Sequence, residues 1–356
     1  MRPEYRVRLF LSVDLAGSTA YKSRQKTILW IRTFEALYAR FQSILNSTFL
    51  QFCEKHPECG QYIENPPRLW KTVGDEIIFA NRINSLFHLF ACVHSFDIAL
   101  GEYKTVLHLN EETTSLDVKG NGWLASFPYP NQTVRKNVDL NSEAEISVPD
   151  EADEKAADET PSSYEFLGPG IDSGFRIARN SSPALFTVSP ALAHALCRAN
   201  TNRDYSAFKF DLVYKGVNSL KGVIDGDEYP IVGVRTERDP SLSRLASLRD
   251  PLDGTPKPNS SQLIEYLESF MSHHQIEAPI FGSGAPGGEV AVPDFYETHY
   301  VPEWHRQNNE LQTANENLRE SETVENGADQ DESASEAIKE VLRAFLEAAV
   351  QQSKKS

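Results

Sequence analysis

The sequence predicts an α+β fold of the ferredoxin-like βαββαβ type, in which strand, helix, two-stranded hairpin, helix and strand follow one another. Three observations support this prediction. An apolar run over Tyr5–Val13 is typical of a strand, and a long stretch of helical periodicity follows it. The segment RLWKTVGDEIIFANRI, residues 68–83, then places two apolar runs around a Gly-Asp turn, as in a hairpin.

The helices are predicted from the spacing of apolar residues. After the first strand, apolar residues recur every three or four positions on one face: Trp30, Phe34, Leu37, Phe41, Leu45 and Phe52. A second helix is predicted over Ser85–Glu102 and a strand over residues 114–128. From Tyr164 we expect a loop and helix, the strand ALFTVS, another helix, and the closing strands KFDLVYKGV and DEYPIVGVR.

The segment Asn141–Thr160 differs in composition from the rest of the chain. It contains eight acidic residues and one lysine, no aromatic residue and almost no large apolar residue. Such a segment buries too little apolar surface to offset the entropy that it would lose on ordering. We therefore expect residues 141–160 to be a disordered acidic insertion that is dispensable for the fold.

A change of pattern near Arg238 predicts a domain boundary. Residues 1–237 are expected to form the main domain and residues 238–356 a partly disordered C-terminal extension. The extension begins with a turn-rich stretch, then has a short helix in QLIEYLESFMSHH and a polar, mobile stretch over Gln307–Gln330. A final helix is predicted from a capping box and an apolar stripe: Ser333, Glu336, Ile338, Leu342, Phe345 and Ala349.

Composition limits the possible functions. With 51 acidic and 35 basic residues, the formal net charge is −16, which argues against a nucleic-acid-binding face. The four cysteines fit no zinc motif, and a cysteine-poor chain suits a reducing cytoplasm. We expect no signal peptide, and no apolar stretch reaches the roughly 18 residues of a membrane span.

Two carboxylates occupy positions that this topology brings together. Asp14 ends the first strand in FLSVDLAGST, and Asp75 lies in the hairpin turn of KTVGDEI. The first strand and the hairpin are neighbours in a ferredoxin-like sheet, so both side chains are expected at one end of it. Two close carboxylates repel unless a cation lies between them, and Mg²⁺ or Mn²⁺ often links such a pair to substrate phosphates. The small residues after Asp14 lead into a helix whose free N–H groups would face a phosphate.

Each feature alone has an ordinary structural explanation. An aspartate after a strand is more often a turn former or helix cap, and Gly-Asp in a hairpin is more often a plain turn. Together they favour metal-dependent phosphoryl or nucleotidyl transfer. A nucleotide-sensing module without turnover, a metal-dependent phosphohydrolase and a diguanylate-type cyclase are the alternatives, although the turn reads VGDEI rather than GGDEF.

Three segments resemble the signature segments of class III nucleotide cyclases and occur in the same order: FLSVDLAGST, KTVGDEIIFA and GPGIDSGFRIAR. The resemblance extends over residues 6–235, with insertions near 53–67 and 131–162. It implies a ferredoxin-like cyclase core that acts as a head-to-tail homodimer. It also implies conversion of a nucleoside triphosphate to a 3′,5′-cyclic monophosphate and pyrophosphate, with two divalent cations, Mn²⁺ or Mg²⁺.

The resemblance further implies roles for individual residues. Asp14 and Asp75 match the two metal aspartates, and Leu15 would give a backbone carbonyl to one metal. Lys221 matches a lysine that contacts the triphosphate, although Lys215 competes for this match. The rest of the triphosphate cradle would be Ala16, Gly17, Ser18 and Thr19.

On the helix of the third segment, Arg176 matches an arginine that stabilises charge on the α-phosphate, a role that suits its forked donors. Without the motif, it would be interpreted as a surface or salt-bridging arginine. Asp172 occupies the position of an asparagine that orients the ribose, so the sequence departs from the family there. An aspartate can accept a hydroxyl hydrogen bond, but it lacks the amide donor.

Lys71 and Glu165 occupy positions at which adenine-selective members of the family carry a lysine and an aspartate that read the base. Guanine-selective members carry an acid at the first position, so Lys71 argues against GTP. A lysine donor suits adenine, cytosine and uracil, and the longer Glu165 favours a smaller base. The other interpretation of Lys71 is an ordinary solvent-facing strand residue.

At a finer level, the sequence is similar to the pyrimidine cyclases of bacterial anti-phage Pycsar systems. The similarity lies in SVDLAGST, in GPGIDSGFRI and in the lack of an attached sensor or membrane domain. It implies a cytoplasmic uridylate or cytidylate cyclase, triggered by phage infection, whose cyclic product acts on a cyclic-nucleotide-responsive effector. UTP is expected ahead of CTP, and both ahead of ATP.

Overall fold

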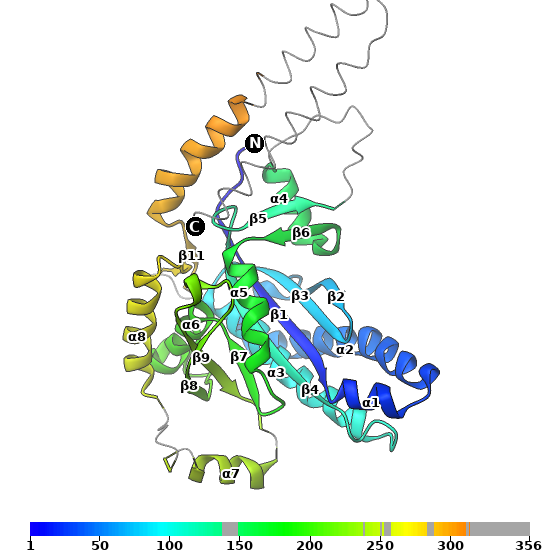
Figure 1. Cartoon of the computed structure of the whole chain (residues 1–356). Coiled ribbons are helices and arrows are strands. Elements are labelled where there is room, and N and C mark those ends of the chain that lie inside the picture. Colours follow the sequence, from blue (N-terminus) through cyan, green and yellow to red (C-terminus); the bar gives the residue numbers. More distant parts are fainter. Residues whose placement is uncertain are drawn as a thin grey trace, which may run out of the picture. The chain divides into compact units, whose positions relative to one another are not determined.

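A seven-stranded sheet is the centre of the computed structural model (Figure 1), which describes residues 1–136, 149–237, 239–249, 251–252, 258–282, 288–310 and 313. The sheet has the order β2-β3-β1-β4-β7-β9-β8, with only β4 and β7 parallel among the adjacent pairs of this sheet. Its strands are β1 (Arg6–Ala16), β2 (Arg68–Val73), β3 (Glu76–Ile83), β4 (Asp117–Phe127), β7 (Leu185–Val188), β8 (Leu212–Ser219) and β9 (Glu228–Arg235).

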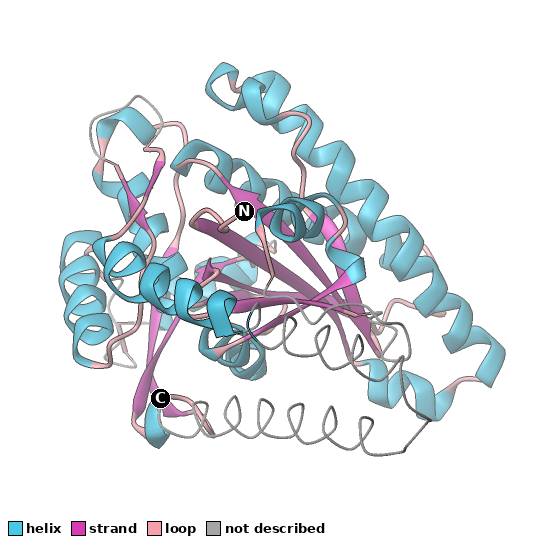
Figure 2. Ribbon diagram, turned by 90° about the horizontal axis from the view of Figure 1, so that it is seen from above, coloured by secondary structure: helices cyan, strands magenta, loops and turns pink. Residues whose placement is uncertain are grey.

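Helices lie on both sides of the sheet (Figure 2). The α-helices labelled in Figure 1 are α1 (Ser18–Arg24), α2 (Thr27–Lys55), α3 (Leu86–His108), α4 (Glu151–Glu159), α5 (Pro169–Ile177), α6 (Pro190–Thr201), α7 (Pro240–Arg249) and α8 (Ser260–His273). Two small sheets pair β5 (Gln132–Arg135) with β6 (Tyr164–Leu167), and β10 (Ile280–Phe281) with β11 (Val290–Ala291).

The predicted α+β fold is confirmed by the strand order. The elements β1, α2, β2, β3, α3 and β4 follow the ferredoxin-like sequence, and their strands lie in the order β2-β3-β1-β4. The predicted periodic stripe is the buried face of α2, although Trp30 is only partly buried. The second helix is longer than predicted, because α3 continues to His108 after its cap at Ser85.

The two faces of β1 differ in chemistry because successive side chains point to opposite sides of a strand. Val7, Leu9, Leu11 and Val13 alternate along the strand and are buried in the core. The other face carries Arg6, Arg8, Phe10, Ser12 and Asp14. Phe10 stacks on Trp123 of β4 with ring centroids 5.2 Å apart, and helix α5 lies against the same tryptophan. The polar residues of this face therefore flank an aromatic layer beneath α5.

One glycine determines how closely α5 approaches the sheet. A Cβ atom at Gly174 would lie 2.3 Å from a ring carbon of Trp123. Asn121, two residues before that tryptophan, donates a hydrogen bond to the Gly174 carbonyl at 3.3 Å. The contact fixes α5, with Asp172 and Arg176, against β4.

The expectation of a disordered insertion is wrong for the residues that are described. Residues 150–159 form a capped helix, α4, whose Glu151 and Glu154 are buried. Glu154 Oε2 lies 2.7 Å from Arg8 Nη2, and Glu151 forms an ion pair with Arg6. Composition did not reveal this helix because buried arginines of β1, rather than apolar contacts, hold it. Residues 137–148, which include the rest of the predicted insertion, lie outside the described residues.

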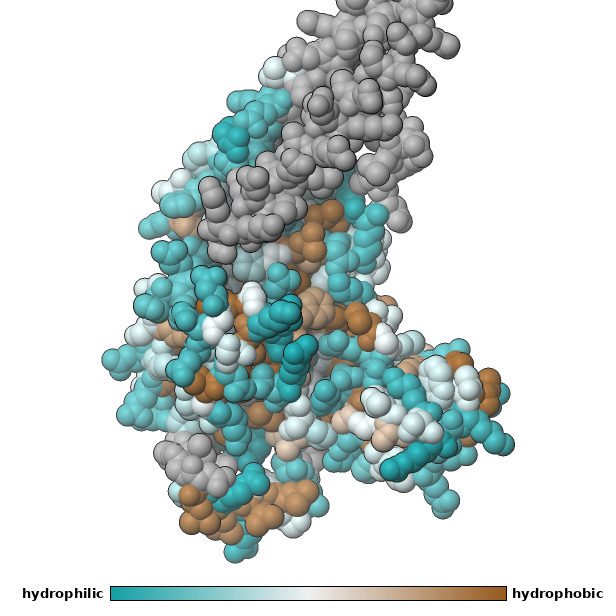
Figure 3. All heavy atoms as spheres, viewed as in Figure 1, coloured by the Kyte–Doolittle hydropathy of each residue, from teal (hydrophilic) through white to brown (hydrophobic). Residues whose placement is uncertain are grey.

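The extension contains helices that belong to the same compact unit as the sheet, Met1–Leu140 with Pro149–Pro302. The predicted short helix is α8, which buries Leu263, Leu267, Phe270 and Met271. The turn-rich stretch before it contains an unpredicted helix, α7, whose leucines form an exposed apolar patch at the lower end of Figure 3. The proposed boundary at residue 237 stays a prediction.

Few residues after Pro302 are described. Of the stretch Gln307–Gln330, which was expected to be mobile, Gln307–Glu310 is helical and most of the remainder is outside the described residues. The final helix predicted from Ser333 also lies outside them. None of the described helices is long and apolar enough to cross a membrane.

Candidate active site

The structure brings Asp14 and Asp75 to the same end of the sheet. Asp14 is the antiparallel partner of Glu76 in the β1–β3 register, and Asp75 precedes Glu76 in the hairpin turn. Burial raises the pKa of Asp14, Lys119 opposes this shift, and the neighbouring Asp75 adds to it. The predicted convergence of the two carboxylates is therefore present in a single chain.

Each carboxylate also has a lysine partner that sequence analysis did not assign to the site. Lys119 Nζ lies 3.0 Å from Asp14 Oδ2, and Lys22 Nζ lies 3.6 Å from Asp75 Oδ1. A third acid, Glu76, accepts a hydrogen bond from Ser12, and burial raises its pKa. Sequence analysis missed Lys119 because its position opposite Asp14 depends on the register between β1 and β4.

The donor set fits a divalent cation only in part. Among the described residues, no group of three or more histidine, cysteine or acidic side chains is arranged to hold a metal ion. Two aspartates and a backbone carbonyl such as that of Leu15 leave several positions for water or substrate oxygens. Mg²⁺ is commonly bound in this way, by one or two carboxylates together with substrate phosphates.

The predicted phosphate cradle follows directly from β1. The strand ends at Ala16, Gly17 has φ 89°, and Ser18 begins α1. A Cβ atom at Gly17 would lie 3.2 Å from the Ser115 carbonyl oxygen, so both conformation and space favour glycine there. The first N–H groups of α1, from Ser18 and Thr19, thus begin next to the carboxylate pair.

Lys71 and Glu165 form an ion pair, although they are 94 residues apart. The Lys71 ammonium also lies 4.0 Å from the centre of the Trp70 ring, while Lys136 lies 3.8 Å from the second Glu165 oxygen. Trp70 donates a hydrogen bond from Nε1 to the Tyr164 carbonyl at 3.0 Å, which joins β2 to β6. Lys71 is therefore a paired, partly buried residue, and its role towards a base stays a prediction.

Arg176 and Lys221 line one surface pocket of about 230 Å³. Arg176 is in the last turn of α5, and Lys221 is in the loop between β8 and β9. Asp172 lies one turn earlier on α5 and is exposed, while Lys215 does not line the pocket. The lining residues of this pocket include neither Asp14 nor Asp75, so the carboxylate pair lies outside the pocket that Arg176 lines.

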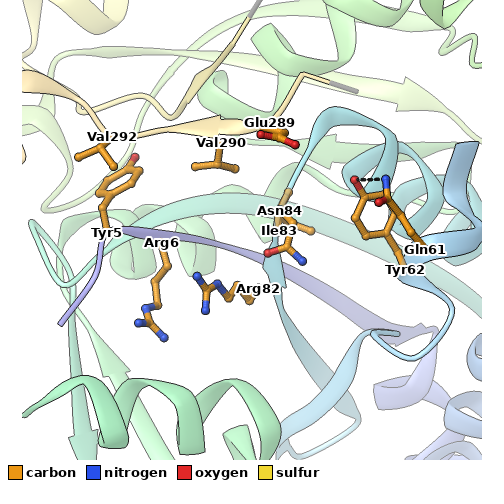
Figure 4. A pocket seen from close by; sticks show the side chains of 10 residues that line it. All are labelled: Tyr5, Arg6, Gln61, Tyr62, Arg82, Ile83, Asn84, Glu289, Val290 and Val292. Atoms are coloured by element: carbon orange, nitrogen blue, oxygen red, sulfur yellow. Dashed lines mark hydrogen bonds between the residues drawn. The ribbon is translucent and has the colours of Figure 1, made fainter. Parts of the chain in front are cut away.

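A different cavity, of about 280 Å³, lies at the opposite end of β1. Figure 4 shows Tyr5, Arg6 and Arg82 on one side of it and Val290 and Glu289 on another. None of the site residues predicted from the sequence lines this cavity. Arginine, glutamate and apolar side chains line it. Both arginines already have a carboxylate partner, because Arg6 Nη1 and Arg82 Nη1 lie 2.7 and 3.6 Å from Asp158 Oδ2.

Comparison with known proteins gives structural similarity only. No protein-family description and no curated protein matches the sequence. The adenylyl cyclase CyaB from P. aeruginosa is 11% identical, with a TM-score of 0.44, over 67% of this chain and 98% of its own. The guanylate cyclase domain of RhGC from Catenaria anguillulae, solved in complex with GTP, is 12% identical, with a TM-score of 0.43, over 66% and 100%. A bacterial light-regulated adenylyl cyclase is 9% identical, with a TM-score of 0.43, over 75% and 59%.

Proposed function

We propose that this chain is a metal-dependent nucleotide cyclase that converts a pyrimidine nucleoside triphosphate, with UTP preferred, to its 3′,5′-cyclic monophosphate. One observation carries the proposal. Asp14 and Asp75 lie at one end of the sheet, and the strand that carries Asp14 leads directly into a glycine turn and the start of α1. Paired carboxylates beside free N–H groups are suited to binding a metal–triphosphate complex.

In the proposed reaction, the ribose 3′-oxygen bonds to the α-phosphorus, the bond to the β-phosphate breaks, and pyrophosphate leaves. Divalent cations, when bound, would supply the charge that makes the 3′-hydroxyl a better nucleophile. Asp14 and Asp75 would hold them, and the hydroxyl proton would pass to water. The N–H groups at the start of α1 would bind the triphosphate, and Arg176 would donate to the α-phosphate oxygens as their charge develops.

The complete site is proposed to lie between two copies of the chain. The Arg176 pocket contains neither metal aspartate, so an arginine from one copy would face Asp14 and Asp75 of the other. Lys71 and Glu165 pair with each other and would contact the base from the arginine side. Lys71 would donate to a ring acceptor such as uracil O4, and Glu165 would accept from N3–H. We place such an enzyme in anti-phage signalling, with an effector that binds the cyclic product.

The test is incubation of the full chain with UTP and Mn²⁺, followed by chromatography of the products. The wild type should form cyclic UMP and pyrophosphate, and Asp75→Asn should form neither while keeping its circular dichroism spectrum. Asp204→Asn, at an exposed position away from the site, is the matched control and should remain active. Linear UMP or UDP would instead indicate a phosphohydrolase, and full turnover by Asp75→Asn would exclude the metal pair.

A further inference from the structure

Arg179 is a cationic residue to which sequence analysis gave no role. It follows α5 in the 3₁₀ helix η3 (Ala178–Asn180), and its exposed side chain lines the same pocket as Arg176 and Lys221. The other lining residues are neutral: Asn180, Asn218, Ser219 and Leu220. The pocket therefore has three positive charges and no carboxylate among its lining residues.

These three cations lack compensation within the part of the chain that the structure describes. None of Arg176, Arg179 and Lys221 forms an ion pair with a described carboxylate. The chain as a whole has a net charge of −16, so three unpaired cations around one pocket are a local exception. Like charges held together repel one another unless an anion lies among them.

Hydrogen bonds connect the segments that form this pocket. Asn218 Nδ2 donates to Asn180 Oδ1 at 2.7 Å, which connects the end of β8 to the turn that carries Arg179. Ser219 Oγ donates to the Gly226 carbonyl at 2.7 Å and closes the loop that carries Lys221. Within this loop, Ile224 has φ 43°, an unfavourable value for a β-branched residue. A strained backbone conformation of this kind persists where the surrounding structure stabilises it.

We propose that Arg179 is a further phosphate-binding residue of this pocket: with Lys221 it binds the two terminal phosphates of the substrate and then the pyrophosphate product, while Arg176 beside them contacts the α-phosphate. This inference rests on the proposed function, and it adds a binding residue to the same site. Pyrophosphate offers several charged oxygens, which match the guanidinium fork of Arg179 and the ammonium group of Lys221. A purely structural role would be stabilisation of the carboxyl end of α5 by positive charge, which requires no anion.

Inorganic pyrophosphate is the probe that separates these roles. Its binding to the full chain is measured by titration calorimetry for the wild type, Arg179→Gln, Arg179→Lys and Arg203→Gln. Arg203 is the matched control, because it is an exposed arginine in the last turn of another three-residue 3₁₀ helix, η4 (Arg203–Tyr205). The loss of one charge-assisted contact should weaken binding by about tenfold in Arg179→Gln. Arg179→Lys should lose less, and Arg203→Gln should match the wild type.

The inference is overturned if Arg179→Gln binds pyrophosphate as the wild type does, or if only its melting temperature falls. It is also overturned if the wild type forms a cyclic nucleotide but binds no pyrophosphate. If pyrophosphate binds in an Arg179-dependent way while no triphosphate is cyclised, the anion site stands and the cyclase function fails. In an active enzyme, Arg179→Gln should raise KM for the triphosphate more than it lowers kcat.

Discussion

Removal of Arg8 tests whether helix α4 is an integral part of the fold. The Arg8 side chain is 1% exposed, and its guanidinium contacts two carboxylates of α4, those of Glu154 and Asp158. Its Nη2 atom lies 2.7 Å from Glu154 Oε2, and its Nε donates to Asp158 Oδ1 at 2.8 Å. A third bond joins Nη1 to Thr133 Oγ1 at 3.0 Å. Arg8→Met would leave the fully buried Glu154 with a more distant partner, Arg6, whose Nε lies 3.8 Å from Oε2.

The expected cost follows from this burial. Breaking a buried ion pair by removing one partner costs about 3–5 kcal/mol, because the remaining buried charge loses its nearest compensation. The guanidinium also lies over the rings of Phe127 and Phe166, at 4.6 and 4.8 Å, which adds a smaller loss. We expect Arg8→Met to lower the free energy of unfolding by about 4 kcal/mol. The free energy of unfolding of a typical domain is about 5–15 kcal/mol, so this loss would be a large part of it.

Urea denaturation of the full chain, followed by circular dichroism, measures this loss. Lys155→Met is the control on the same helix, since Lys155 is 61% exposed and its Nζ lies 3.6 Å from Glu151 Oε1. It should cost less than about 1 kcal/mol. The double variant Arg8→Met/Glu154→Met should recover part of the loss, because no buried charge remains unpaired. If Arg8→Met behaves like Lys155→Met, the ion pairs of Arg8 do not hold α4 against the sheet as described.

Three further predictions follow from the site and the core. Mixing inactive Asp75→Ala with inactive Arg176→Ala should restore activity, since one of the two sites in a mixed dimer has neither defect; mixed dimers without activity would exclude shared sites. Burial lowers the pKa of His94 to about 4, from 6.5. The unfolded chain therefore binds more protons than the folded chain between these pH values. As the pH drops from 6.5 to 4, the free energy of unfolding of the wild type should fall by about 3 kcal/mol relative to that of His94→Phe. Parallel plots of the free energy of unfolding against pH for the two proteins would contradict this. Gly174→Ala should cost about 1–3 kcal/mol in unfolding measurements and disturb α5, because its methyl group would overlap the Trp123 ring; unchanged stability would refute this packing.

Local sequence patterns were sufficient for the main elements of the fold. The apolar period of α2 and the paired runs of β2 and β3 depend on neighbours within one element, so they are visible in a short window. The convergence of Asp14 and Asp75 needed only the βαββαβ order, because that order makes β1 and β3 neighbours. Resemblance assigned Lys71 and Glu165 to one base-reading site, but it did not predict their ion pair, since no local pattern connects residues so far apart.

The sequence could not predict features that depend on distant partners. Helix α4 was missed because its acidic residues are compensated by Arg6 and Arg8, which lie about 150 residues earlier. The lysine beside Asp14 was missed because it depends on the register between β1 and β4, which local periodicity does not give. The cationic pocket needed the loop between β8 and β9 to close near the end of α5. In each case the decisive contact joins elements that are remote in the chain.

The most direct test of the account is a competition experiment. The full-length protein is incubated with ATP, GTP, CTP and UTP at equal concentrations and with Mn²⁺, and the cyclic products are quantified by mass spectrometry. The account predicts that cyclic UMP dominates, and that Lys71→Ala loses this preference by about one to two orders of magnitude while keeping more of its basal turnover. Dominant cyclic AMP would contradict the pyrimidine assignment, and the absence of every cyclic nucleotide would contradict the proposed cyclase function itself.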